Sequence, residues 1–182
     1  MCITGGPTAA VIALRNPDIR VTVVDRDEKR IRRWNSKHPP IYEPGLSAIL
    51  RITRDGSREP LSGITPTENC ETTLPLSAVA RSPNLVFTTD VAACVGEADL
   101  VMIAVNTPTK KRGHGAGSAT DMAAFEAVTA AVGRFARPGA IIVEKSTVPC
   151  RTAQLVKDTV SPLEPLFDFS ASCPSKPRKI MF

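Results

Sequence analysis

The sequence predicts an α/β fold built around a doubly wound parallel sheet. Short apolar runs rich in β-branched residues alternate with amphipathic helical segments, which is the pattern of parallel strands joined by crossover helices. Several of these runs are followed at once by polar residues, and parallel sheets bind their ligands at the carboxyl ends of the strands. The candidate functional residues are therefore expected along one edge of the sheet.

The first elements lie near the start of the chain. A helix opened by two glycines is predicted over residues 5–14, and the β-branched run at 21–24 predicts a buried strand. A second helix is predicted over 27–35, because Ile31 and Trp34 share one face and charged residues occupy the other.

The second group of elements continues the alternation. Buried strands are predicted at 85–88, 100–105 and 140–143. Helices are predicted at 90–96, 121–137 and 149–160. Thr120 or Asp121 can cap the middle one of these helices, and Pro138 with Gly139 ends it.

Two stretches differ from this pattern. Residues 51–84 and 161–182 hold half of the sixteen prolines and show no sustained hydrophobic period. We interpret both as loop or disordered segments.

Composition excludes several classes of protein. The 182 residues correspond to about one domain. The net charge of +5 is spread among acidic residues, and aromatics are 4%, which argues against a nucleic-acid-binding module. No apolar run approaches the length of a membrane span, and no signal segment opens the chain. Five cysteines without a C-x-x-C pair predict no zinc or redox site and a reducing, cytoplasmic location.

Asp25 is the first candidate binding residue. It follows the run at 21–24 and lies about twenty residues after the glycine pair Gly5 and Gly6, where a carboxylate accepts both hydroxyls of an adenosine ribose. It would repel a 2′-phosphate, which favours NAD over NADP. The alternative is that Asp25 only caps the next helix. The glycines themselves allow a pyrophosphate to approach the helix N-terminus, or they form an ordinary turn.

Two further strand ends carry hydroxyl groups. Residues 106–109, Asn-Thr-Pro-Thr, suit contacts to a nucleotide ribose or phosphate, although the same four residues also suit a simple polar turn. Ser146 and Thr147 follow the run at 140–143 and can hold a water or a ligand oxygen, or cap the helix from Pro149. We interpret Cys150 as a core thiol, and His38 and His114 have no metal-ligand spacing.

Six segments, in this order, resemble the UDP-glucose/GDP-mannose dehydrogenase family and cover most of residues 5–160. They read GGPTAAVIA, VTVVDRDEKRIRRWNS, PIYEPGL, EADLVMIAVNTPTK, ATDMAAFEA and IIVEKSTVPCRTA. PIYEPGL and NTPTK are most similar to the eukaryotic members that act on UDP-glucose.

The resemblance implies a Rossmann-like domain and an NAD-dependent oxidation of UDP-glucose to UDP-glucuronate, in two steps at the sugar C6, by a homo-oligomeric enzyme. It assigns Gly5 to the third glycine of the dinucleotide fingerprint, and Asp25 and Arg30 to the adenosine ribose. It places a cofactor loop at Val105, Asn106, Thr107, Pro108 and Thr109. It places Ser146 near the nicotinamide. Thr147 corresponds to the threonine that helps hold a catalytic water.

The resemblance also implies what the chain lacks. The family's first strand and first two fingerprint glycines would precede Met1, so an NAD-binding domain at 1–160 is expected to be incomplete at its first strand. The match ends near Val160, before the family's catalytic cysteine, and 161–182 is expected to be a divergent, disordered tail. We therefore expect weak NAD binding and no turnover. The alternative is a catalytically dead fragment that associates with a full-length subunit.

Overall fold

The fold is a five-stranded parallel sheet with helices on both faces, as the sequence predicts. The computed structural model describes residues 5–57, 82–149, 152, 154, 156 and 179–182. The strand order is β2-β1-β5-β3-β4, and every pairing is parallel. The strands are β1 (Arg20–Val24), β2 (Leu85–Thr88), β3 (Leu100–Ile103), β4 (Ile141–Glu144) and β5 (Lys179–Met181). The helices are α1 (Gly5–Arg15), α2 (Glu28–Trp34), α3 (Leu46–Thr53), α4 (Val91–Glu97) and α5 (Ala123–Phe135).

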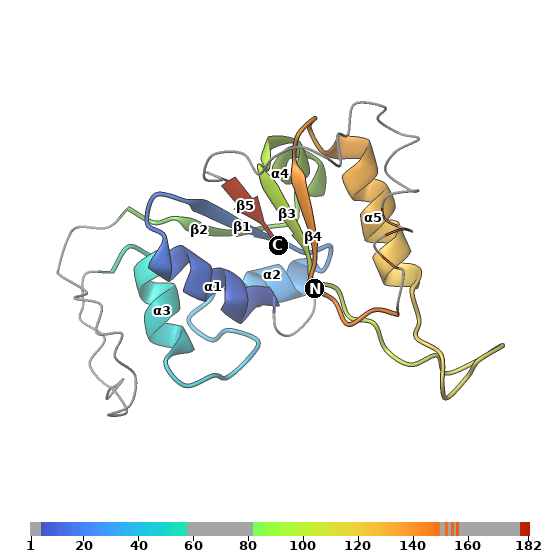
Figure 1. Ribbon diagram of the computed structural model, residues 1–182. Helices are drawn as coiled ribbons and strands as arrows, with labels where there is room; N and C mark the ends of the chain where they lie inside the picture. Colours follow the sequence, from blue (N-terminus) through green and yellow to red (C-terminus); the bar gives the residue numbers. More distant parts are fainter. Residues whose placement is uncertain (1–4, 58–81, 150–151, 153, 155, 157–178) are drawn as a thin grey trace, which may run out of the picture.

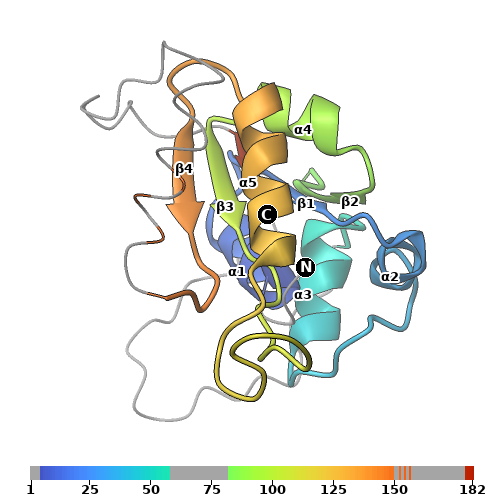
Figure 2. The same ribbon diagram turned by 90° about the vertical axis from the view of Figure 1, so that its right-hand side faces the viewer.

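The helices form two layers around the sheet. α1 and α3 cover one face, and α4 and α5 cover the other (Figures 1 and 2). Alternate residues of β1 explain why both faces need a cover. Val21 and Val23 are fully buried in the core on the α1 side, and Val24 packs against the core on the α5 side.

The turn from β1 into α2 follows from two aspartates. Asp27 is the N-cap of α2 and accepts hydrogen bonds from the backbone N–H groups of Lys29 and Arg30, at 2.9 and 3.2 Å. Asp25 accepts one from the Asp27 N–H at 3.0 Å. The predicted helix over 27–35 is confirmed, and its apolar residues Ile31 and Trp34 are the ones that are buried.

The other predicted elements agree with the structure to within a few residues. Asp90 caps α4 through a 3.0 Å bond from the Ala93 N–H. Asp121 accepts a bond from the Ala123 N–H at the start of α5. Of the helix predicted over 149–160, only residues 152, 154 and 156 are described, and these are helical.

The prediction of a loop from residue 51 onward is wrong at its first residues. Residues 51–53 complete α3, whose Leu46, Leu50 and Ile52 are buried. The segment's prolines begin only at Pro60, so nothing in the residues at 51–53 opposes a helix. Residues 58–81 lie outside the described part of the chain.

The prediction of a disordered tail over 161–182 is wrong at residues 179–182, because residues 179–181 form β5. β5 lies in the middle of the sheet, between β1 and β3. Ile180, Met181 and Phe182 are 7, 6 and 5% exposed, so three consecutive large apolar side chains are buried there. Residues 161–178 are not described.

Candidate functional site

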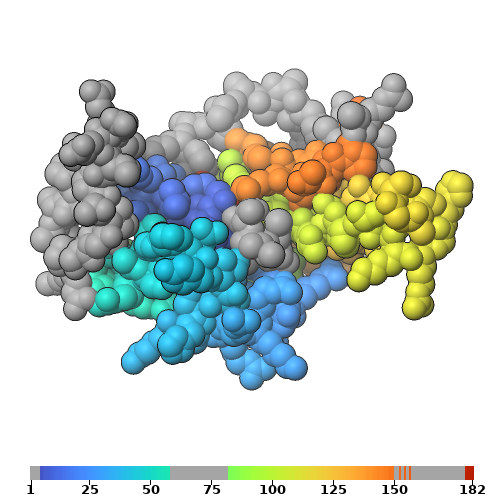
Figure 3. All heavy atoms as spheres, turned by 90° about the horizontal axis from the view of Figure 1, so that it is seen from below, coloured from blue at the N-terminus to red at the C-terminus, as the bar shows by residue number. Residues whose placement is uncertain are grey.

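The site lies at the carboxyl edge of the strands. The arrows of β3 and β4 both point downward in Figure 2, so their carboxyl ends lie at the lower edge of the sheet. Figure 3 views the molecule from that lower side. α2, the loop after β3 and the segment after β4 all reach the surface on that side (Figure 3). A cavity of about 700 Å³ is lined by residues from the ends of β1, β3 and β5 and from α2 and α5, a size typical of small-molecule sites.

Asp25 is the acidic residue at the end of β1 and lines this cavity. It is only 8% exposed. Its Oδ2 accepts a 2.6 Å charge-assisted hydrogen bond from the Arg30 guanidinium, and its Oδ1 accepts from the Asp27 N–H. The carboxylate is therefore fixed in orientation by donors to both of its oxygens.

The ionisation of Asp25 follows from these contacts. Burial raises the pKa of this carboxyl, while the hydrogen bonds from the Asp27 N–H and the Arg30 guanidinium lower it, and the net shift is downward. Asp25 is consequently an anion at neutral pH.

Gly6 lies where α1 meets the aromatic side chain of α2. A Cβ built on Gly6 would lie 2.2 Å from Cζ2 of Trp34, a distance that no real Cβ adopts. Trp34 is fully buried and stacks on Phe87 with ring centroids 5.1 Å apart. Gly6 thus permits the close packing of α1 on α2 that keeps the helix start beside the end of β1.

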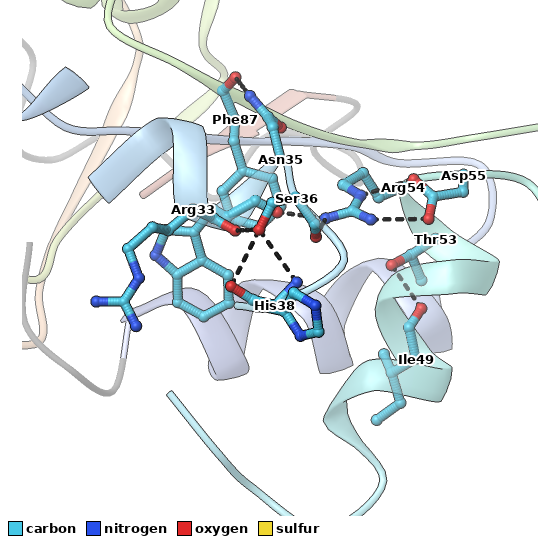
Figure 4. Close-up of polar contacts among 10 residues, drawn as sticks. Arg33, Asn35, Ser36, His38, Ile49, Thr53, Arg54, Asp55 and Phe87 are labelled. Carbon is cyan, nitrogen blue, oxygen red and sulfur yellow. Dashed lines mark hydrogen bonds and ion pairs between the residues drawn. The ribbon is translucent and has the colours of Figure 1, made fainter. Parts of the chain in front are cut away.

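Arg54 holds the end of α2 in place. It reaches from the end of α3 and donates hydrogen bonds to the carbonyl oxygens of Trp34 and Ser36, the latter at 3.0 Å (Figure 4). Its guanidinium also pairs with Asp55 at 2.6 Å. Asn35 adds a 3.2 Å bond to the carbonyl oxygen of Phe87 on β2 (Figure 4).

The ends of β3 and β4 are joined through the predicted hydroxyl residues. The Ser146 Oγ accepts a 2.8 Å bond from the Val105 N–H and lies 3.0 Å from the Val105 carbonyl oxygen. The Thr107 hydroxyl donates to the Thr147 carbonyl oxygen at 2.6 Å. Ser146 and Thr107 therefore align the two strand ends through backbone atoms.

The structure brings only some of the predicted site residues to the cavity. Asp25, Arg30, Val105 and Asn106 line it. The remaining predicted residues are not among its lining residues: Gly5, Thr107, Pro108, Thr109, Ser146 and Thr147. Thr109 instead pairs with Thr120, which closes the loop after β3 into a hairpin-like turn. The cofactor-binding and catalytic roles of all these residues stay predictions.

Sequence reasoning missed several residues of the cavity wall. Lys29 and Arg33 of α2 line it, and Met181 and Phe182 come from β5. Helical spacing after Asp25 could have indicated the α2 residues, because positions 29, 30 and 33 lie on one side of that helix. Nothing near residue 25 in the sequence indicates β5.

Glu144, the last residue of β4, is a half-buried acid near this edge. Its Oε1 is buried and has no hydrogen-bond partner, and burial raises the pKa of the carboxyl above its ordinary value. The described residues contain no group of three or more His, Cys, Asp or Glu side chains able to hold a metal ion. Cys150 lies outside the described residues.

The comparison with protein families decides the assignment. The model of the UDP-glucose/GDP-mannose dehydrogenase family, NAD binding domain, matches residues 3–71 and 63–175. The chain belongs to this family. The matched domain is the family's NAD-binding domain, so NAD is its cofactor. The resemblance of the six sequence segments is thereby confirmed.

Curated relatives in the UDP-glucose/GDP-mannose dehydrogenase family agree with the match. The chain is 42% identical over 153 residues to UDP-glucose 6-dehydrogenase 1 of Oryza sativa subsp. japonica. It is 40% identical over 152 residues to UDP-glucose 6-dehydrogenase of Drosophila melanogaster. Each alignment covers 84% of this chain and 26% of the relative, so the chain spans about a quarter of the length of these relatives.

Solved structures show the same fold. A ternary complex of GDP-mannose dehydrogenase from Pseudomonas aeruginosa aligns with a TM-score of 0.65 and 24% identity, covering 90% of this chain and 31% of that one. UDP-D-ManNAc dehydrogenase from Pyrococcus horikoshii aligns with a TM-score of 0.64 and 19% identity, covering 91% and 31%. None of the described helices is long and apolar enough to cross a membrane.

Proposed function

We propose that the chain is the NAD-binding part of a UDP-glucose 6-dehydrogenase, which oxidises UDP-glucose to UDP-glucuronate with NAD as oxidant. The similarity to relatives of that name, at 40–42% identity, supports the substrate. One structural observation carries the cofactor half of the proposal. Asp25 lies buried and ionised at the end of β1, held by Arg30, in the wall of a cavity of about 700 Å³.

Asp25 is suited to bind the adenosine ribose. A buried carboxylate at the end of this strand is suited to accept hydrogen bonds from the 2′- and 3′-hydroxyls of a ribose. Its negative charge disfavours the 2′-phosphate of NADP. Arg30 orients the carboxylate through its hydrogen bond to Oδ2.

The phosphates of the cofactor are expected at the start of α1. Gly5 and Gly6 are buried residues in the first turn of this helix of eleven residues, and the N-terminus of a helix favours an anion. Arg26, Lys29 and Arg33 line the cavity that Asp25 lines and add positive charge on the α2 side.

The nicotinamide end is assigned to the loop after β3 and the segment after β4. Bound NAD accepts hydride from the sugar carbon. Val105 and Asn106 offer a wall of the cavity, and Ser146 fixes that wall through its bonds to Val105. Thr107 holds the backbone of Thr147, and the exposed Thr147 side chain is then placed to hold a water.

Location and assembly complete the proposal. The five cysteines scattered along the sequence suit a reducing compartment, and we assign the enzyme to the cytoplasm. The partner is a nucleotide-sugar substrate, and the complete enzyme is expected to be a homo-oligomer. Nucleic acid and membrane are not expected partners.

The expected weak binding of NAD no longer follows from the sequence, because β5 fills the middle of the sheet. Calorimetric titration of the chain with NAD and with NADP is expected to show binding of NAD and at least about tenfold weaker binding of NADP. Asp25→Ala is expected to weaken NAD binding roughly tenfold and to reduce the preference. Asp18→Ala, at an exposed position outside the cavity, is the control.

A binding preference that survives Asp25→Ala would contradict the assignment of the ribose site. The catalytic half is tested separately with a chimaera, in which residues 5–156 replace the matching part of the rice enzyme. NADH formation from UDP-glucose is the readout. A folded chimaera that binds NAD and forms no NADH would oppose the proposed activity while leaving the cofactor site intact.

A further inference from the structure

The middle of the sheet is held together by one short strand. Within the described residues, β1 and β3 form no pairing with each other, and both pair with β5. Ile180 lies opposite Val21 on one side and opposite Leu100 on the other. We name the facing edges of β1 and β3, residues 20–24 and 99–101, the acceptor site.

Backbone hydrogen bonds join β5 to both edges. The Phe182 N–H donates to the Thr22 carbonyl oxygen, and the Val24 N–H donates to the Phe182 carbonyl oxygen, both at 2.8 Å. On the other edge, the Asp99 N–H donates to the Lys179 carbonyl oxygen at 3.0 Å. These bonds satisfy donors and acceptors in the centre of the sheet, where unpaired groups are costly.

The entrance of the acceptor site is acidic. The Asp99 carboxylate accepts a 2.7 Å bond from the Lys179 N–H, and the Glu97 carboxylate accepts a 3.0 Å bond from the Lys179 Nζ. Arg137 forms an ion pair with the other oxygen of the Asp99 carboxylate. This ion pair fixes the orientation of the carboxylate that accepts the hydrogen bond from the Lys179 N–H. A strand that begins with a cationic residue therefore fits this end.

The interior of the acceptor site is apolar on both faces. Ile180 and Phe182 belong to the core that includes α1 residues, and Met181 belongs to the core between the sheet and the α4–α5 layer. Lys-Ile-Met-Phe thus supplies a cation at the entrance and then one buried side chain to each face in alternation.

The position of β5 relative to α1 indicates which strand it replaces. α1 leads directly into β1, and β5 lies next to β1 in parallel. A strand, a helix and a neighbouring parallel strand form the usual right-handed βαβ unit when they follow one another in sequence. Here the helix and second strand come from the start of the chain, and the first strand comes from residues 179–181.

We propose that the acceptor site is a binding site for a parallel strand with the sequence Lys-Ile-Met-Phe, and that the chain fills it in cis with its own residues 179–182. The connectivity is that of a circular permutation. Placed directly ahead of Met1, the same four residues would be separated from α1 only by residues 1–4, a normal length for a strand-to-helix connection. The inference rests on the sheet and is independent of the proposed catalytic activity.

Three variants of the full chain test this proposal. The first lacks residues 179–182. The second carries these four residues directly ahead of Met1 instead of at positions 179–182. The third variant has the moved segment and also carries Ile180→Asp, which puts a charge at the apolar centre of the acceptor site.

The readouts are thermal unfolding, amide exchange at Val24 and Asp99, and molecular mass in solution. We expect the deletion to lose its cooperative transition and to lower the protection of both amides at least roughly a hundredfold. The variant with the moved segment is expected to be a monomer that regains the cooperative transition and the protection of both amides. The variant that also carries Ile180→Asp is expected to regain neither.

Three results would overturn the proposal. Protection of Val24 and Asp99 that survives the deletion would show that β5 does not complete the sheet. A moved segment that fails to restore protection would show that the site does not accept the strand ahead of α1. A parent chain that forms dimers with exchanged β5 strands would exclude filling in cis.

Discussion

At the scale of single residues, Gly6 shows why a glycine opens α1. Glycine is needed here for space, because the Cβ of any other residue would overlap the indole of Trp34. The indole cannot move away easily, since it is fully buried and stacked on Phe87. The same contact fixes the distance between the start of α1 and Trp34 of α2.

Gly6→Ala is therefore expected to lower the free energy of unfolding by about 1–3 kcal/mol, as overpacked core substitutions do. Urea denaturation followed by Trp34 fluorescence measures it. The matched control is Gly96→Ala in α4, where the added Cβ would meet only the Phe135 carbonyl oxygen at 3.4 Å. That change is expected to be neutral or slightly stabilising. Equal stability of Gly6→Ala and the parent chain would contradict the packing argument.

Asp25 contributes to stability in a pH-dependent way. Its folded-state pKa lies below the ordinary value of 3.8, so the ionised form stabilises the fold above that value. This contribution is lost as the pH falls below 3.8 through the folded-state pKa.

Asp25→Asn is expected to be less stable than the parent at neutral pH and to show a flatter stability profile between about pH 5 and 2. Unfolding by urea at a series of pH values measures the difference. Asp18→Asn, at an exposed position, should leave the profile unchanged. A parent and an Asp25→Asn variant that differ by the same amount at every pH would refute the role of ionisation.

At the scale of elements, residue patterns predicted β1 to β4 and most of the helices, because each carries its own signal. β1 is a β-branched run, and α2 and α4 have aspartate caps. The candidate binding residue Asp25 at the end of β1 followed from the same signal, since a strand end determines which side chain reaches the edge of the sheet. β5 could not be found this way, because its three residues are too few for a period and follow a proline-rich stretch.

The contact between α1 and β2 also escaped sequence analysis. Asn84 precedes β2 and is only 7% exposed. Its side-chain amide nitrogen lies 2.9 Å from the carbonyl oxygens of Ala13 and Ile19 and 3.0 Å from that of Asn16. A single side chain thus caps the end of α1 from a segment about seventy residues away, which no local pattern indicates.

Asn84→Ala is expected to lower the free energy of unfolding by about 1–3 kcal/mol, because it removes the buried amide donor that lies within 3.0 Å of three backbone carbonyl oxygens. Asn84→Asp should lose more, since a carboxylate would face the same carbonyl oxygens. Chemical denaturation measures both. Asn106→Ala, at an exposed position after β3, is the control. A tolerated Asn84→Asp would contradict the proposed cap.

At the scale of the whole molecule, two cores lie on opposite faces of the sheet, and β5 contributes side chains to both. Ile180 contributes to the core on the α1 side and Met181 to the core beside α4 and α5. The pairs β2–β1 and β3–β4 have their own hydrogen bonds, yet in the described part of the chain only β5 bonds to both. We therefore expect the two halves to unfold together only while β5 is in place.

The chain has one tryptophan, Trp34, which lies in the core on the α1 side. Its fluorescence reports on that half, whereas far-ultraviolet circular dichroism reports on all helices. Both signals are expected to change at the same urea concentration in the parent chain. Met181→Ala, although it removes a side chain from the opposite core, is expected to shift both transitions together by about 2–5 kcal/mol.

Lys179→Ala is the control, because this side chain is about half exposed and pairs only at the entrance with Glu97; its loss should cost less than about 1 kcal/mol. If Met181→Ala moved the circular dichroism transition and left the Trp34 transition in place, the halves would be independent and β5 would not couple them. If the fluorescence and circular dichroism transitions shifted together, the three residues of β5 would make the sheet a single cooperative unit. Weakening this central strand would then destabilise both halves of the sheet.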